Sequence, residues 1–471
     1  MKKLLSIVIA MVIIVGVLPV TASAASGKVD VYGCSISAAA KQVCFVVCDR
    51  NEENGLDLLM QYMAENEFAP GFSKYYYVPE GTVIDFKVIA EKLPELQNLA
   101  VVYGEVKNLS ALADMENLVW LGLYQNEGVD SMSFLKKLPK LKKLRYVNSC
   151  ESIKPLSYLK ELTDLRLTVS SEAISDLTPL KSLTKLKKLE IGNTISENIS
   201  ALGNIKSLKE LDIDVESGTD LSFLKKLTKL ESLSVEVRGD GFAEGLDSIA
   251  SLKKLKSLTL NGFDSYYTKE EIDGYEIRFM NVMDLSFIGK IKSLESLDIS
   301  YCNATFIENI GDLKGLKELK IMDLKYKLHN MSFLKDLTGL EYLSLDGQDG
   351  LKGSDISGLK NLKTLILMYS RFDDLSGLKK CTSLEKLTVF DCYSDFDVKW
   401  IPADNIKDIL FKVQKDDRIK NMDKLASLKK LEILHLDNTG ISEKTIKKIK
   451  KALPKCRIEV YEQGYEEYAV Y

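Results

Sequence analysis

The amino-acid sequence predicts an α/β solenoid, and one recurring spacing of apolar residues carries this prediction. Leucines are spaced by three and then by two, as in Leu186-x-x-Leu189-x-Ile191, and the next such block begins about 22 residues later. A spacing of two is typical of a strand, because alternate side chains lie on one face, and a spacing of three suits a tight helix-like turn. Neither segment can bury its leucines alone, so the copies are expected to stack.

The repeat can be followed through about fifteen copies, and we place the solenoid at residues 91–440. The first copy is Leu96-Leu99-Val101 and the last is Leu431-Leu434-Leu436. Ahead of each strand, the spacing of three extends backwards into return segments that are nearly identical, such as SFLKKL at 133–138 and at 222–227. Their many lysines are most simply explained as a solvated outer surface, and we assign them no function.

These repeats resemble the bacterial leucine-rich repeat proteins of the internalin type. The segment Ile174–Ile191, with the sequence ISDLTPLKSLTKLKKLEI, is similar to their repeat. The resemblance implies a leucine-rich repeat horseshoe with a concave parallel β-sheet and 3₁₀ or irregular segments on the convex side. It also implies an asparagine three residues after the last strand leucine, where its amide bonds the neighbouring turn, and Asn126 fits this position.

Other residues stand at the asparagine position in most repeats. Serine, threonine and cysteine, as at Ser370 and Cys392, can partly replace the amide. Arg238 and Phe263 cannot replace it, so we expect local irregularity around repeats seven and eight.

Residues 1–24 have the features of a secretory signal peptide. Lys2 and Lys3 give a positive start, an apolar run extends from Leu4 to Val20, and Ala22-Ser23-Ala24 is a small-x-small cleavage site. Cleavage there predicts a secreted, extracellular protein without a transmembrane anchor in the mature chain, either free or held non-covalently at the cell surface. The alternative is an uncleaved anchor helix.

Both ends of a solenoid need caps, because a bare terminal repeat would expose its leucines. We expect an N-terminal cap at 25–90, with a helix over 55–66, and a C-terminal cap at 441–471. The C-terminal cap should open with a helix whose N-cap is Ser442, because serine oxygens accept hydrogen bonds from the first helical N–H groups. A final strand, RIEVY, should follow at 457–461.

One connection is longer than the others. Leu255 and Leu294 are separated by an interval that exceeds the usual repeat, which indicates an insertion at about 262–284. Insertions in repeat proteins form loops on one face, often the binding face. The sequence leaves open whether this insertion binds a partner or only covers its own repeat.

Composition and motifs argue against several functional classes. The chain has a formal net charge of −4, so it lacks the basic balance of a nucleic-acid-binding protein. It has two histidines, and its eight cysteines form no C-x-x-C pair, which removes the usual zinc and redox patterns. We therefore expect no nucleic-acid partner, no metal, no cofactor and no enzymatic activity.

The strand residues between the leucines should form the concave face. They are arginines in repeats three and four, mostly acidic in repeats five to nine, and apolar in repeats twelve and thirteen. The acidic stretch spans roughly 20 Å, the size of a protein contact, and aromatic and methionine side chains commonly anchor such contacts. The alternative is a solvated face without a ligand. The predicted partner-binding residues are Trp120, Tyr124, Arg145, Arg166, Glu190, Asp212, Asp214, Glu236, Asp298, Tyr342, Asp346, Ile366, Met368, Tyr369 and Phe390.

A second, minor candidate is the tripeptide Arg238-Gly239-Asp240, which follows a predicted strand and should lie on an exposed turn. Integrins bind such loops in some extracellular proteins. A three-residue match also arises by chance in about one chain in ten of this length.

Together these observations predict an exported leucine-rich repeat protein that recognises another protein through its concave face. The resemblance implies contact with a host or neighbouring-cell surface. Two alternatives stay open: a structural scaffold of the cell envelope without a specific ligand, and a polysaccharide-binding module.

Overall fold

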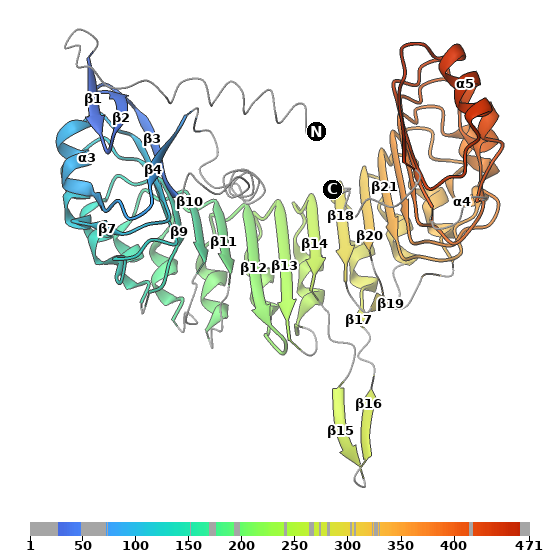
Figure 1. Ribbon diagram of the computed structural model, residues 1–471. Coiled ribbons are helices and arrows are strands. Elements are labelled where there is room, and N and C mark those ends of the chain that lie inside the picture. Colours follow the sequence, from blue (N-terminus) through green and yellow to red (C-terminus); the bar gives the residue numbers. More distant parts are fainter. Residues whose placement is uncertain are drawn as a thin grey trace. The chain divides into compact units, whose positions relative to one another are not determined.

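The structure is a computed structural model that divides into two units, Met1–Gly128 and Val129–Tyr471 (Figure 1). The predicted signal peptide at 1–24, the predicted helix at 55–66 and the tail at 462–471 lie outside the residues that it describes. The described residues are 27–48, 72, 74–150, 152–168, 176–192, 198–239, 243–262, 268–272, 275–279, 283–301, 304–305, 308–322, 324, 328, 330–413 and 418–461.

Unit 1 contains a parallel sheet whose strands follow the order β4-β3-β6-β8. Two of them, β3 (Gln42–Cys48) and β4 (Tyr75–Pro79), come from the predicted N-terminal cap. The other two, β6 (Asn98–Val102) and β8 (Trp120–Tyr124), belong to the first two leucine repeats. The region ahead of the repeats therefore extends the sheet instead of only covering its end.

Short elements complete unit 1. The helix α3 (Phe86–Lys92) begins where the Asp85 carboxylate accepts a hydrogen bond of 2.9 Å from the Lys87 N–H, and it buries Phe86 and Ile89. The remaining elements are the antiparallel pair β1 (Lys28–Val31) and β2 (Cys34–Ser37), the parallel pair β5 (Ile84–Asp85) and β7 (Val106–Lys107), and the 3₁₀ segment η1 (Leu109–Asp114).

Unit 2 is one long parallel sheet in which each strand pairs with the strand of the next repeat (Figure 1). The register joins equivalent positions, so Leu189 lies beside Leu211 and Leu211 beside Leu233. The strands, in spatial order, are β9 (Lys143–Val147), β10 (Asp164–Thr168), β11 (Lys188–Gly192), β12 (Glu210–Glu216), β13 (Ser232–Arg238), β14 (Ser257–Asn261), β18 (Ser296–Ser300), β20 (Glu318–Met322), β21 (Tyr342–Asp346), β22 (Thr364–Met368), β23 (Lys386–Phe390), β25 (Asp408–Lys412), β27 (Ile433–Asp437) and β28 (Arg457–Tyr461).

The return segments are mostly single 3₁₀ turns, which confirms the prediction from their spacing of three. A side chain two residues upstream often caps the turn: the Asp220 carboxylate accepts a hydrogen bond of 2.8 Å from the Ser222 N–H. The segments are η2 (Met132–Lys137), η3 (Lys154–Tyr158), η4 (Thr178–Ser182), η5 (Ile199–Asn204), η6 (Ser222–Lys226), η7 (Leu246–Ser251), η8 (Ser286–Lys290), η9 (Glu308–Asp312), η10 (Ser332–Asp336), the one-turn helix α4 (Gly353–Ile356), η11 (Ser376–Lys380), η12 (Val398–Trp400) and η13 (Met422–Ser427). The small pairs β17 (Met283–Asp284) with β19 (Ala304–Thr305) and β24 (Phe396–Asp397) with β26 (Ile419–Lys420) accompany them.

The leucines form the core between the strands and the return segments. Leu211 is 2% exposed and Leu367 is fully buried, whereas Asp212, between two inward residues of β12, is exposed. Burying one such side chain contributes about 1.5–3 kcal/mol, so the stacked repeats provide the stability that one repeat lacks. We call the opposite face, formed by the first, third and fifth residue of each strand, the open face; it is the face that the sequence predicts to be concave.

Side chains after the strands tie consecutive repeats together. The Asn126 amide donates to the Tyr103 carbonyl at 2.8 Å, and Cys392 Sγ replaces such an amide by bonding the Leu367 carbonyl at 3.4 Å. At Arg238 the chain departs from the regular repeat, because β12 and β13 extend by two residues and pair through Glu216 and Arg238. Phe263 lies outside the described residues.

The C-terminal end of unit 2 contains the expected helix and strand. The helix α5 spans Glu443–Ala452, and the Ser442 hydroxyl accepts a hydrogen bond of 3.3 Å from the Thr445 N–H. β28, which corresponds to RIEVY, then pairs with β27.

The insertion contains a separate antiparallel pair, β15 (Thr268–Ile272) and β16 (Tyr275–Phe279). Among the described residues, these two strands pair only with each other (Figure 1). Within the same described ranges, none of the helices has the length and apolarity that crossing a membrane requires.

Candidate functional site

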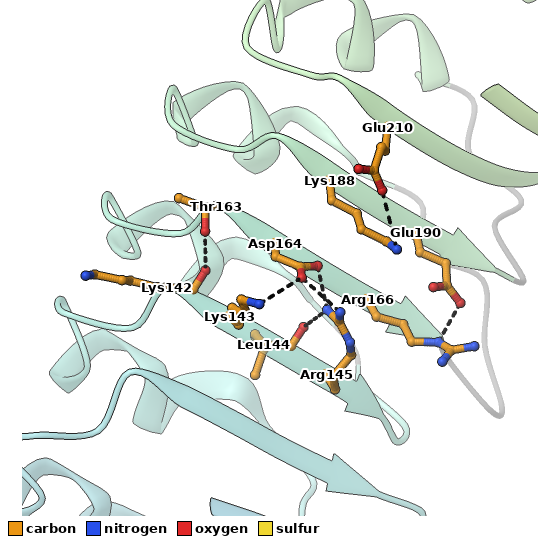
Figure 2. Close-up of polar contacts among 10 residues, drawn as sticks. All are labelled: Lys142, Lys143, Leu144, Arg145, Thr163, Asp164, Arg166, Lys188, Glu190 and Glu210. Atoms are coloured by element: carbon orange, nitrogen blue, oxygen red, sulfur yellow. Dashed lines mark hydrogen bonds and ion pairs between the residues drawn. The ribbon is translucent and has the colours of Figure 1, made fainter. Parts of the chain in front are cut away.

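The open face between β9 and β12 is lined by ion pairs that join neighbouring strands (Figure 2). Arg145 binds both carboxylate oxygens of Asp164, at 2.6 and 3.0 Å, and its side chain is buried. Arg166 Nε lies 2.5 Å from Glu190 Oε1, and the Lys188 amine lies 3.4 Å from Glu210. The arginines and the acidic residues predicted as separate stretches are therefore interleaved, because parallel register places equivalent positions about 4.8 Å apart.

The same pattern continues onto β12 and β13, with one exception. Arg238 binds Asp214 at 2.7 Å and lies 3.4 Å from Glu236. Asp212 has no ion pair among the described residues, and its side-chain hydrogen bond is to Ser234. Surrounding protein displaces water and raises the pKa of Asp212, although the side chain stays exposed. We call Arg145, Asp164, Arg166, Glu190, Asp212, Asp214, Glu236 and Arg238 the charged tract.

Aromatic side chains gather farther along the face, at the carboxyl ends of β22 and β23. The Tyr369 ring meets the Phe390 ring edge to face, with centroids 5.5 Å apart, and the Lys412 amine lies 4.7 Å above Phe390. The Arg371 guanidinium lies 5.6 Å from the Tyr393 ring. Tyr369 and Tyr393 are 39% and 41% exposed, so a large part of each side chain is in contact with solvent. We call Met368, Tyr369, Arg371, Phe390, Tyr393 and Lys412 the aromatic tract.

The backbone holds Tyr369 in an uncommon conformation. Its φ is 46°, in the left-handed region that bulky residues rarely adopt. This conformation lets the Tyr369 N–H donate to the Phe390 carbonyl at 3.0 Å, so the ladder to the next repeat continues one residue past the strand. Tyr301, with a φ of 56°, bonds the Met322 carbonyl in the same way. Such strain often marks functional positions, because surrounding structure must maintain it.

Two predicted aromatic anchors are not exposed, so this part of the prediction is wrong. Trp120 is 6% exposed and Tyr124 is 1% exposed. The Trp120 ring packs against Phe72, with centroids 5.1 Å apart. The rings of Trp120 and Tyr124 lie over Gly122, where an added Cβ would lie 2.6 Å from Trp120 and 2.8 Å from Tyr124. These residues therefore form a small aromatic core of unit 1.

Three further predicted residues are also buried: Arg145, Ile366 and Phe390 are 5%, 8% and 7% exposed. Large side chains on adjacent parallel strands cover one another, as Tyr369 and Lys412 cover Phe390. The other predicted positions remain reachable from solvent. Asp212 and Tyr369 are exposed, and Arg166, Glu190, Asp214, Glu236, Asp298, Tyr342, Asp346 and Met368 are half-buried.

The minor candidate Arg238-Gly239-Asp240 begins at the end of β13, and both Arg238 and Gly239 are exposed. Arg238 is the last residue of β13, and its guanidinium is held by Asp214 and Glu236. Asp240 lies outside the described residues.

The sequence reasoning missed the first residue of each strand on the open face. Asp164, Lys188 and Glu210 occupy this position: Asp164 is the counter-charge of Arg145, and Lys188 and Glu210 form an ion pair with each other. Carrying the strand alternation one step towards the amino end would have found them. Arg371 and Tyr393 lie beyond the strands, where periodicity gives no signal.

From β12 to β27, the residue just before each strand of the long sheet forms a further row that borders the open face. Lysine and glutamate alternate along this row, each N–H bonds the carbonyl of the previous member, and several neighbours form ion pairs, such as Lys317 with Glu295 at 2.6 Å. We call it the charge ladder. Its members are Lys209, Glu231, Lys256, Glu295, Lys317, Glu341, Lys363, Glu385, Lys407 and Glu432.

Comparison with known proteins identifies the fold. No protein-family model matches the chain, and no curated protein sequence matches it. An internalin from Listeria monocytogenes is similar in structure, with 22% sequence identity, a TM-score of 0.50, and coverage of 73% of this chain and 87% of the internalin. A leucine-rich repeat protein from Leptospira interrogans has 20% identity and a TM-score of 0.49, covering 78% of this chain and 91% of its own.

This chain has leucines spaced by three and two, parallel strands in equivalent register and 3₁₀ return segments, and its structure is similar to that of the internalin. The chain therefore has the leucine-rich repeat fold, of the type found in internalins.

Proposed function

We propose that this protein is a binding protein that recognises another protein through the open face of unit 2. The observation that carries the proposal is the aromatic tract, in which exposed Tyr369 and Tyr393 lie beside Arg371. Tyrosine and arginine are enriched among the residues that dominate protein interfaces, because they bury much area and still form hydrogen bonds. Exposed aromatic groups on a rigid sheet cost little entropy on binding.

The charged tract supports the same proposal by adding specificity. Most of its charged side chains are paired with opposite charges of the same chain, whereas the exposed Asp212 carboxylate forms no ion pair among the described residues. A partner that places a lysine or arginine at Asp212 would gain a charge-assisted contact, whereas an acidic partner would be repelled. The half-buried Asp298 and Asp346 lie on the open face between the charged tract and the aromatic tract.

Export is part of the proposal and is supported by the sequence features of residues 1–24. An exported chain places the open face outside the cell, where it can meet a host or neighbouring-cell surface. N-terminal sequencing of protein from the culture medium should then begin at Ala25.

A capture experiment with matched variants tests the proposed face. We expect Tyr369→Asn combined with Tyr393→Ala to lose a protein that the unchanged chain captures from surface extracts, because both anchors are removed. Asparagine tolerates the left-handed backbone at position 369. The control is Tyr158→Ala, which removes an exposed tyrosine on the return segment η3 and should capture the same protein.

Other results of this experiment would favour the competing functions. Capture that is the same for all three proteins would remove the aromatic tract from the interaction and favour a scaffold without a specific ligand. Retention of a protease-resistant polysaccharide by the unchanged chain, and not by the double variant, would favour a polysaccharide-binding module.

A further inference from the structure

The pair β15 and β16 has a two-faced pattern that its register defines. Thr268 pairs with Phe279, Glu270 with Ile277, and Ile272 with Tyr275, which places these six residues on one face. Lys269 pairs with Arg278 and Glu271 with Glu276, so the other face carries only charged residues. One face is therefore mainly apolar and the other is fully charged.

A hairpin of this kind is incomplete by itself. A two-stranded sheet is at best marginally stable in water, and three or more strands with an apolar face are needed for independent stability. Like charges directly opposite each other also destabilise a strand pair, and this hairpin has two such pairs, Lys269 with Arg278 and Glu271 with Glu276. A further strand paired with the hairpin would enlarge it to the three or more strands that a stable sheet needs.

The outer edge of β16 has the geometry to accept that strand. Two residues connect Ile272 and Tyr275, and in such a hairpin the pair next to the turn is hydrogen-bonded internally. Hydrogen-bonded and non-hydrogen-bonded pairs then alternate, so Glu276 and Arg278 turn their backbone N–H and C=O groups outward. An unpaired edge of this kind is a template for another strand.

The sequence of β16, Tyr-Glu-Ile-Arg-Phe, complements itself when two copies run antiparallel. Centred on Ile277, the pairing puts Tyr275 opposite the second copy's Phe279, Glu276 opposite the second copy's Arg278, and Ile277 opposite itself. Both aromatic pairs and the isoleucines then share the apolar face, and two opposite-charge pairs lie on the charged face. The outward groups of Glu276 and Arg278 meet each other, as an antiparallel ladder requires.

Three other strands with a free edge among the described residues, β15, β28 and β4, do not have this property. An antiparallel self-pairing of β15 puts Glu270 opposite Glu270, and one of β28 puts Glu459 opposite Glu459. Like charges directly opposite oppose both pairings. In unit 1, β4 ends in Pro79, which lacks a backbone donor.

We propose that β16 pairs with β16 of a second copy of this chain, forming a four-stranded antiparallel sheet and a two-fold symmetric dimer. The contact is isologous: the same residues serve both copies, and the symmetry makes the Tyr275–Phe279 and Glu276–Arg278 pairs each occur twice. The proposed dimer does not depend on the ligand of the open face. The dimer and the proposed protein recognition can therefore be disproved separately.

Measurement of molar mass by light scattering, over a wide range of concentration of the full chain, tests the dimer. We expect a mass approaching twice the 52.8 kDa of one chain as concentration rises. Arg278→Glu puts two glutamate pairs at the contact, and Glu276→Arg puts two arginine pairs there. Each variant should weaken association about tenfold or more.

These variants separate loss of pairing from loss of the hairpin. Arg278→Glu replaces a like-charge pair with Lys269 by an attractive one, and Glu276→Arg does the same with Glu271, so each change favours the hairpin itself. A mixture of the two variants should form a heterodimer, because each glutamate then meets an arginine. The control, Lys269→Glu on β15, should keep the dimer.

Monomeric unchanged chain at every concentration would overturn the proposal. So would a dimer that Arg278→Glu and Glu276→Arg leave intact, or two monomeric variants that do not associate when mixed.

Discussion

The missing side chain of Gly122 determines how the aromatic residues of unit 1 pack. Trp120 and Tyr124 lie over this glycine, and Phe72 covers Trp120. We predict that Gly122→Ala destabilises the protein by about 1–3 kcal/mol, because the added methyl group overlaps both rings and overpacks the site. Urea unfolding followed by tryptophan fluorescence measures this. Gly315→Ala is the control, since its nearest contact is an ordinary 3.5 Å; equal stability of both variants would contradict the packing.

Adjacent residues of β12 should respond in opposite ways to added charge. Leu211 is 2% exposed among other leucines, so Leu211→Asp buries an unpaired charge and should unfold the chain or lower its melting temperature strongly. Asp212→Lys changes an exposed position and should leave the circular dichroism melt nearly unchanged, while it weakens binding of a basic partner. Similar melts for the two variants would show that the assigned faces are wrong.

Strand alternation predicted which residues face the open side, but it could not predict which of them are exposed. Exposure depends on neighbours from distant parts of the sequence. Phe72 covers Trp120, Asp164 holds Arg145, and Lys412 covers part of Phe390. Of these partners, Phe72 does not follow from the period of the repeat, whereas Asp164 and Lys412 occupy strand positions that the alternation gives. The prediction of the binding residues themselves, apart from the buried ones, stays a prediction.

At the element scale, the charge ladder joins equivalent positions of consecutive repeats, as the buried leucine rows do. Glu341 lies between Lys317 and Lys363, and it pairs with Lys363 at 2.5 Å. These lysines hold the pKa of Glu341 below its usual value of 4.5 in the folded protein. Its stabilising contribution is therefore present above the unfolded pKa near 4.5 and is lost as the pH falls through the lower folded pKa.

We predict that Glu341→Lys lowers the unfolding midpoint at neutral pH and low ionic strength, because three lysines then stand in a row. Added salt should reduce the deficit, since at about 1 M salt charges are screened beyond roughly 3 Å. Thermal unfolding at two salt concentrations measures the effect, with Glu341→Gln as the uncharged control. A deficit that is independent of salt, or equal in both variants, would contradict the ladder.

At the element scale, the spacing of three predicted the return segments well, because a 3₁₀ helix has three residues per turn and so places every third side chain on one face. The extension of β12 and β13 was not predictable in the same way. Val215 and Val237 are buried, which continues the strand alternation by one more inward residue. The sequence contains this signal, but an asparagine expected at positions 216 and 238 would lie after the strand and not within it.

At the scale of the whole molecule, the fifteen predicted repeats correspond to the strands β6, β8 to β14, β18, β20 to β23, β25 and β27. Periodicity predicts such a fold well, since each repeat contains the same spacing of apolar residues. Strands β3 and β4 carry no leucine repeat and were missed, because pairing to the first repeat is a non-local event. The hairpin β15–β16 was predicted only as an insertion.

The alternation of the charge ladder also restricts how this gene can lengthen or shorten. From Lys209 to Glu432 the sign changes at every step. Loss or duplication of a single unit by recombination would bring two lysines or two glutamates together, whereas a change by two units would restore the order. Descendants of this chain should therefore differ from it by even numbers of units in that stretch.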